Sequence, residues 1–130
     1  MITRVNIVGA YVSDQQRALE FYTQKLGMEL RNDQPMGPDQ RWIEVGPKGH
    51  DTTIVLYTPE GQEDRIGTFA SFTLECDDIM ATYEELRGKG VEFAQPPEMQ
   101  PWGMMMAIVK DQDGNSIVMT QPPAGEPNPA

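Results

Sequence analysis

The chain nearly repeats itself, and this internal repeat restricts its fold more than any other feature. The two halves align when one is shifted by 63 positions. The matches are Asp14 with Asp77, Ala18 with Ala81, Gly27 with Gly90, Met36 with Met99, Pro38 with Pro101, and Ile54-Val55-Leu56 with Ile117-Val118-Met119. Duplicated units commonly enclose a cleft where they meet. We therefore expect two similar modules, residues 1–60 and 61–121, around one cavity.

Each copy shows the pattern of a strand, a helix and three more strands. In the first copy, Ser13 and Asp14 offer a helix N-cap and Gly27 a helix end. The expected strands are 2–12, 28–34, 40–46 and 52–58. The second copy predicts a helix at 79–88 and strands at 67–76, 91–95, 103–110 and 115–121. The proline-rich residues 122–130 are expected to form a disordered tail.

The amino-acid composition limits the kinds of partner that the protein is expected to bind. Twenty acidic against ten basic side chains give a formal net charge of -10. Such a charge disfavours nucleic acid and anionic membranes and attracts cationic ligands. No apolar run reaches the roughly 18 residues of a membrane span, the N-terminal residues lack a signal-peptide pattern, and Cys76 is the single cysteine. These features favour a cytoplasmic protein with neither a nucleic-acid nor a membrane partner.

Several motifs resemble those of one family. The run Val12-Ser13-Asp14, followed by Ala18-Leu19-Glu20-Phe21-Tyr22 and Leu26-Gly27, is similar to the entry signature of the vicinal oxygen chelate superfamily. Its members include glyoxalases, bleomycin-resistance proteins and extradiol dioxygenases. The second half adds Cys76-Asp77-Asp78-Ile79, Gly88-Lys89-Gly90-Val91, Pro101-Trp102-Gly103 and Asp111-Gln112-Asp113-Gly114-Asn115. The resemblance covers residues 1–121. It implies an α+β fold of two tandem βαβββ modules whose strands curl into a mixed-sheet cup, usually completed in a homodimer. Side-by-side and strand-exchanged pairings both stay open.

Enzymes of this family hold a divalent metal in the cup through His, Gln or Glu side chains. Counted from the matched motifs, the four ligand positions fall on Ile7 (or Asn6, one residue earlier), Val55, Ser71 and Val118. None of these side chains is a good ligand for a first-row metal. The resemblance therefore implies that the family's metal site has been lost, and we predict no metal and no cofactor.

Strand alternation predicts the walls of the cup. The wholly apolar set of each strand should pack on a helix, and the mixed set should face the cup. The predicted wall residues are Ile7, Gly9, Tyr11, Trp42, Glu44, Val55, Tyr57, Phe69, Ser71, Thr73, Met105, Ala107, Val118 and Thr120. The ligand-binding candidates are Ile7, Tyr11, Trp42, Glu44, Val55, Tyr57, Phe69, Ser71, Met105, Val118 and the loop residue Trp102. Aromatic walls with few polar groups suit a flat organic ligand.

The sequence offers little for catalysis. Glu44 is a weak candidate for a lone acid or base, although a pairing with Arg4 or Arg41 competes with that role. His50 is the only histidine and is expected in an exposed turn, so no Ser-His-Asp set can form. Cys76 is expected to be an inert buried thiol.

Three functions follow from these patterns. The favoured one is a metal-free binding protein for an aromatic or cationic compound such as an antibiotic, resembling bleomycin-resistance proteins. The alternative is a glyoxalase-like lyase or isomerase, or a dioxygenase, that uses a divalent metal. The third is a domain whose cup is a relic and whose role is protein–protein contact. The sequence favours binding over catalysis.

Overall fold

The computed structural model describes residues 1–122 and contains two four-stranded mixed sheets. The first module consists of β1 (Ile7–Tyr11), α1 (Gln15–Glu20), η1 (Phe21–Lys25), β2 (Glu29–Pro35), β3 (Arg41–Gly46) and β4 (Thr53–Tyr57). The second consists of β5 (Phe69–Glu75), α2 (Ile79–Gly88), β6 (Phe93–Met99), β7 (Met105–Lys110) and β8 (Ser116–Gln121). The short helix η2 (Glu63–Arg65) lies in the linker between the modules.

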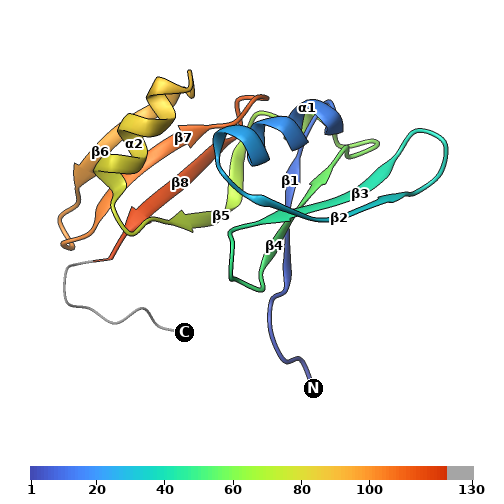
Figure 1. Cartoon of the computed structure of the whole chain (residues 1–130), viewed down its shortest axis with the longest axis horizontal. Coiled ribbons are helices and arrows are strands. Elements are labelled where there is room, and N and C mark those ends of the chain that lie inside the picture. Colours follow the sequence, from blue (N-terminus) through green and yellow to red (C-terminus); the bar gives the residue numbers. More distant parts are fainter. Residues whose placement is uncertain (123–130) are drawn as a thin grey trace.

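The sheets follow the same plan, which confirms the predicted pair of βαβββ units. Their strand orders are β1-β4-β3-β2 and β5-β8-β7-β6, with the first strand of each module parallel to the last. The two sheets adjoin where β1 approaches β5. Figure 1 shows α1 above the first sheet and α2 beside the second. Within residues 1–122, no helix is long and apolar enough to span a membrane.

Two strand boundaries differ from the prediction. β1 begins at Ile7 rather than at residue 2, because its partner β4 begins opposite it at Thr53. β6 runs from Phe93 to Met99, beyond the expected 91–95, and shifts its register against β7 around its two prolines. Such shifts accommodate residues that lack a backbone N–H. Apart from Pro122, the tail predicted at 122–130 lies outside the described residues.

The repeat does not keep one spacing. Asp14 and Asp78 are the two helix N-caps, and they lie 64 positions apart, so the predicted match of Asp14 with Asp77 is wrong by one residue. The glycines that follow the helices, Gly27 and Gly90, lie 63 apart and both have positive φ. The π-helical turn η1 absorbs the extra residue of the first module. π-turns of this kind are often found at functional sites.

A second shift of one residue inverts the predicted faces of β7. Glu44 lies opposite Val55, and Ile108 lies opposite Val118, so these two pairs correspond in the modules. Met105 therefore packs against the hydrophobic core instead of facing the cup. Ala107, also predicted in the cup wall, is fully buried in that core. Met106 lies with Ile108 on the opposite face.

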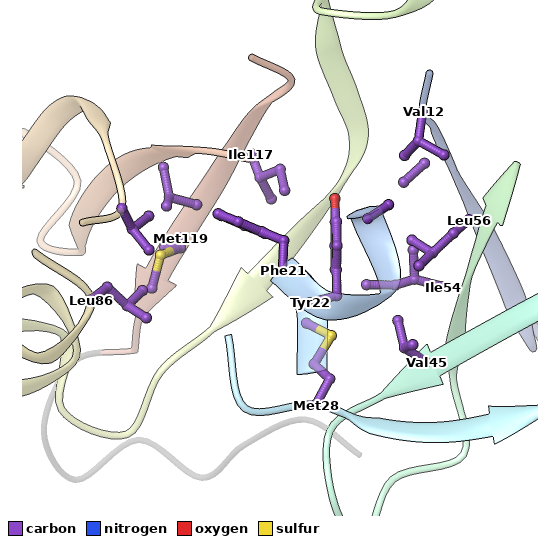
Figure 2. Close-up of a cluster of buried hydrophobic side chains, with 14 of the residues drawn as sticks. Val12, Phe21, Tyr22, Met28, Val45, Ile54, Leu56, Leu86, Ile117 and Met119 are labelled. Atoms are coloured by element: carbon purple, nitrogen blue, oxygen red, sulfur yellow. The ribbon is translucent and has the colours of Figure 1, made fainter. Parts of the chain in front are cut away.

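One hydrophobic core joins the two modules. The π-turn brings two consecutive aromatic residues into it, since Phe21 is 8% exposed and Tyr22 is fully buried. Figure 2 shows the Phe21 ring directed toward Ile117 of the second module, while Tyr22 lies nearer Leu56 of the first. Burial of each such ring contributes about 1.5–3 kcal/mol. Phe21 and Tyr22 thus join the shared core from one helical segment, in addition to the contact between β1 and β5.

Candidate functional site

A cleft of about 240 Å³ lies where β1 and β5 meet. It is lined by Gly9, Ala10, Tyr11, Tyr22, Arg65, Thr68, Phe69, Ala70, Ser71 and Asn115. The first strands of both modules form its walls, as expected for a cavity between duplicated units. Its volume is just below the range of about 300–1,000 Å³ that is common for small-molecule pockets.

A buried hydrogen-bond network closes the base of the cleft. The Tyr22 hydroxyl of the first module donates to Asp111 Oδ2 of the second at 2.7 Å. Asn115 Nδ2 donates to the same carboxylate oxygen and to the Tyr11 carbonyl, both at 2.8 Å. The Gly67 N–H donates to Asn115 Oδ1 at 2.7 Å. We call Tyr22, Asp111 and Asn115 the intermodule network, because they tie the two walls of the cleft together.

Burial keeps the Tyr22 hydroxyl of this network protonated. Asp111 is 6% exposed and Asn115 is 5% exposed. Burial raises the pKa of the Tyr22 hydroxyl well above its usual value, and the adjacent Asp111 carboxylate raises it further. Tyr22 therefore remains a neutral hydrogen-bond donor at any physiological pH.

The upper wall of the cleft carries aromatic rings and one cation. The guanidinium of Arg65 lies over the Tyr11 ring, 5.9 Å from its centroid, within the range of a cation–π contact. The Tyr57 ring lies 6.3 Å from the Tyr11 ring. Phe69 is 65% exposed at the cleft. An aromatic ligand in the cleft would thus contact both aromatic rings and a positive charge.

The four positions that the resemblance assigns to metal ligands lie on the open faces of the sheets, opposite the core. Val8 and Ala10 pack on the core side of β1, and Ala70 and Phe72 do so on β5. The side chains that alternate with these along each strand therefore point away from the core, toward the open face of the sheet. The side chains at the four metal positions, Ile7, Val55, Ser71 and Val118, include no imidazole and no carboxylate. They do not fit a divalent cation, and within residues 1–122 no three His, Cys, Asp or Glu side chains gather into a metal-binding group.

Glu44 lies on the open face of the first sheet and accepts two short hydrogen bonds. The Thr53 hydroxyl donates to Oε1 at 2.7 Å, and Trp42 Nε1 donates to Oε2 at 2.6 Å. These bonds, with that from Thr53 the strongest, hold the pKa of Glu44 below its usual value. A carboxylate with a lowered pKa is a poor general base at neutral pH, but it presents a stable negative charge to a ligand.

The competing ion pairs predicted for Glu44 do not form. Arg41 pairs with Asp33 at 2.6 Å, and Arg4 pairs with Asp51 at 2.8 Å. Among residues 1–122, no lysine or arginine lies within ion-pair distance of Glu44. Its half-buried charge is therefore offset by hydrogen bonds alone.

The structure brings only some of the candidate residues together. Tyr11, Phe69 and Ser71 line the cleft. Outside its lining, on the open sheet faces, lie Ile7, Trp42, Glu44, Val55, Tyr57 and Val118. Trp102 is 66% exposed in the turn between β6 and β7.

The two remaining reactive side chains lie as the sequence predicted. His50 is exposed in the loop before β4. Cys76 is a buried free thiol, and burial raises its pKa.

Six cleft residues were missed by sequence reasoning: Ala10 and Ala70, and the four polar residues Tyr22, Arg65, Thr68 and Asn115. Arg65 and Thr68 belong to the linker, where no periodicity indicates which side chains point inward. Asn115 and Tyr22 were noted only as parts of the motifs that resemble those of the family, and neither was assigned to the cavity. An available signal was that Tyr22 places a polar hydroxyl on the most apolar face of its helix.

Comparisons with known proteins place this fold in a family. The Glyoxalase/Bleomycin resistance protein/Dioxygenase superfamily model matches residues 4–119. An uncharacterized Bacillus subtilis protein, YetH, is 40% identical over 121 residues, which is 93% of this chain and all of YetH.

Solved structures agree with that match. A superfamily member from Sphaerobacter thermophilus is 35% identical with a TM-score of 0.86, covering 93% of this chain and 98% of the other. TnmS3, an antibiotic binding protein from Streptomyces sp. CB03234, is 36% identical with a TM-score of 0.79, covering 93% and 97%. The chain therefore belongs to the Glyoxalase/Bleomycin resistance protein/Dioxygenase superfamily.

Proposed function

We propose that this chain is a metal-free protein that binds an aromatic or cationic small molecule, such as an antibiotic, in the cleft between its modules. The observation that carries the proposal is the set of side chains at the family's metal positions. Ile7, Val55, Ser71 and Val118 offer no metal donor set, while an aromatic-lined cleft persists at the junction. The similarity to the antibiotic binding protein TnmS3 supports the same class of function.

The charge distribution supports a cationic group on the ligand. The chain has a formal net charge of -10, which attracts cations toward an open cleft. Glu44 remains ionised beside the Trp42 ring. Because the carboxylate lies at the N–H edge of the indole, it can pair with an amine while the face of the Trp42 ring stays available to a ring cation.

The proposal includes a homodimer in the cytoplasm. Phe69 is 65% exposed on the open face of the second sheet, and exposed aromatic surface often marks an interface or a ligand site. A second copy packed on the open faces would enlarge the small cleft. Cys76, a buried free thiol, fits a reducing compartment.

Calorimetric titration with bleomycin and with ethidium, a planar cation, tests the binding. We expect saturable binding by at least one of these compounds and weaker binding by Glu44→Gln. The matched control is Glu84→Gln, which removes the same charge from an exposed position on α2. No binding of either compound by the wild-type protein would contradict the proposal.

Metal analysis separates binding from the enzymatic alternative. Protein purified without chelators should contain less than a stoichiometric amount of zinc, nickel, manganese or iron. A stoichiometric metal would instead support a lyase, isomerase or dioxygenase. A cleft that binds no compound in a broad thermal-shift screen would support protein–protein contact.

A further inference from the structure

Three polar side chains of the cleft, those of Tyr22, Thr68 and Asn115, already form hydrogen bonds within the protein. The Tyr22 hydroxyl donates to Asp111. The Asn115 amide uses its Nδ2 and its Oδ1 within the protein. The Thr68 hydroxyl donates to the Arg65 carbonyl at 2.7 Å. A ligand must therefore find its polar partners elsewhere in the lining.

The Arg65 guanidinium is the strongest donor still available. Within residues 1–122 it forms no ion pair with any carboxylate, and it lies over the face of the Tyr11 ring. No acidic side chain belongs to the described lining of the cleft. Arginine presents several N–H donors in a planar fork that suits oxygen acceptors.

The backbone around Arg65 is held in place. Its N–H donates to the Gln62 carbonyl at 3.0 Å, and its carbonyl accepts the Thr68 hydroxyl. The Gly67 N–H is tied to Asn115 of the intermodule network. The guanidinium is therefore presented from a fixed loop and not from a free chain end.

We propose that Arg65 is a specificity-determining residue that selects aromatic ligands bearing an acceptor oxygen, such as a carbonyl, phenolate, carboxylate or sulfonate. This inference rests on the proposed small-molecule function and defines its ligand more narrowly. The ring lies against Tyr11 and Phe69, and the oxygen accepts from the guanidinium of Arg65.

This selectivity is compatible with an acidic protein. A neutral carbonyl oxygen satisfies the guanidinium without being repelled by the surrounding negative charge. Glu44 lies on the same open face as Gly9, two strands away, because Glu44 is opposite Val55 and Val55 is opposite Gly9. With strands about 4.8 Å apart, the two backbone positions are separated by roughly 10 Å. A ligand with an acceptor oxygen at one end and an amine at the other would therefore interact with both the Arg65 guanidinium and the Glu44 carboxylate.

Two probes that share one aromatic scaffold test the inference. The first is 8-anilinonaphthalene-1-sulfonate, and the second is N-phenyl-1-naphthylamine, which lacks the sulfonate. Both fluoresce when removed from water, so both dissociation constants follow from fluorescence titration. Loss of a charge-assisted hydrogen bond in Arg65→Gln should weaken binding of the sulfonate about tenfold or more. Binding of the neutral amine should change less than about twofold, because no acceptor oxygen is lost.

Arg87→Gln is the matched control. The Arg87 guanidinium lies over the Tyr83 ring at 5.2 Å, which is the same kind of contact on the surface of α2, outside the lining of the cleft. This variant removes the same charge and should leave both dissociation constants unchanged. Thermal midpoints of both variants confirm that they fold.

The outcomes separate the two proposals. If both probes bind and Arg65→Gln weakens them equally or not at all, the specificity role is wrong while the binding function stands. Equal effects of Arg65→Gln and Arg87→Gln would indicate general electrostatics and also refute that role. If neither probe nor any compound of the first titration binds the wild-type protein, the proposed function fails and the inference fails with it.

Discussion

The intermodule network makes a direct prediction about stability. Tyr22→Phe removes one hydroxyl and keeps the buried ring, so it creates almost no cavity. Asp111 then loses a donor at 2.7 Å but keeps Asn115 Nδ2 and two backbone N–H groups, those of Asp113 and Asn115. Because Asp111 is 6% exposed, water cannot replace the hydroxyl. Hydrogen bonds to charged groups contribute about 1.5–3 kcal/mol, so we expect a loss of about 2 kcal/mol.

Urea unfolding followed by circular dichroism measures this loss. The midpoint should fall while the slope stays constant, because the surface exposed on unfolding is unchanged. For a chain of this size the thermal midpoint should fall by roughly 6–10 °C.

Tyr83→Phe is the control. Its ring packs on Phe93 with the centroids 4.8 Å apart, and its hydroxyl forms no hydrogen bond to residues 1–122. It should change the stability by less than about 0.5 kcal/mol. Equal effects of the two variants would refute a structural role for the network.

Alkaline pH provides a second measurement on the same pair. The pKa of Tyr22 is raised in the folded protein, whereas an unfolded tyrosine titrates near pH 10. The folded state therefore keeps a proton that the unfolded state releases. The stability from this group is complete below about pH 10 and is lost as the pH rises further. Tyr22→Phe should lose less stability than the wild type between about pH 9 and 11, and an equal loss would contradict this assignment.

Three further predictions concern other elements. Ala107→Leu overpacks the core and should lower the free energy of unfolding by about 1–3 kcal/mol in urea. Ile108→Leu on the open face should lower it less. If Ile108→Leu were the more destabilising, the faces of β7 predicted from the sequence would be correct after all. Because the pKa of Glu44 is lowered in the folded state, the stability that its carboxylate contributes is lost as the pH falls through that pKa. Glu44→Gln should therefore make the free energy of unfolding less dependent on pH on the acid side. An unchanged pH dependence would contradict this role of Glu44. Gly67→Ala should lower the thermal midpoint, because φ is 86° and a Cβ would lie 3.3 Å from the Asp113 carbonyl oxygen; an unchanged midpoint would show that the turn relaxes.

Elements with strong local signals were predictable from the sequence. Helix α2 spans Ile79–Gly88 as expected, because Asp78 supplies a cap and Gly90 supplies the left-handed turn that ends it. The open faces of β1, β4, β5 and β8 also agree with the predicted alternation. In each of these strands, a clear apolar set marks the core side.

The errors came from positions where one residue is inserted without a local signal. A π-turn in the first helix changes the repeat spacing, and nothing in the local composition indicates it. In β7, a run of three methionines and Ala107 is apolar on both faces, so alternation could not determine which side is buried. Arg65 escaped notice because a linker residue acquires its neighbours only from tertiary packing.

The π-turn in the first helix also affects how a ligand would orient. Two identical modules would present the same wall twice, and a ligand between them could bind equally well after a half-turn. Here Tyr22 spans the junction, whereas Leu86, 64 positions later, has no hydroxyl to donate in return. The half-turn is no longer a symmetry operation, so the two orientations of a bound molecule differ in energy. For a ligand bound as proposed, the loss of that twofold degeneracy would cost only about 0.4 kcal/mol of affinity, and one binding pose would be preferred over the other.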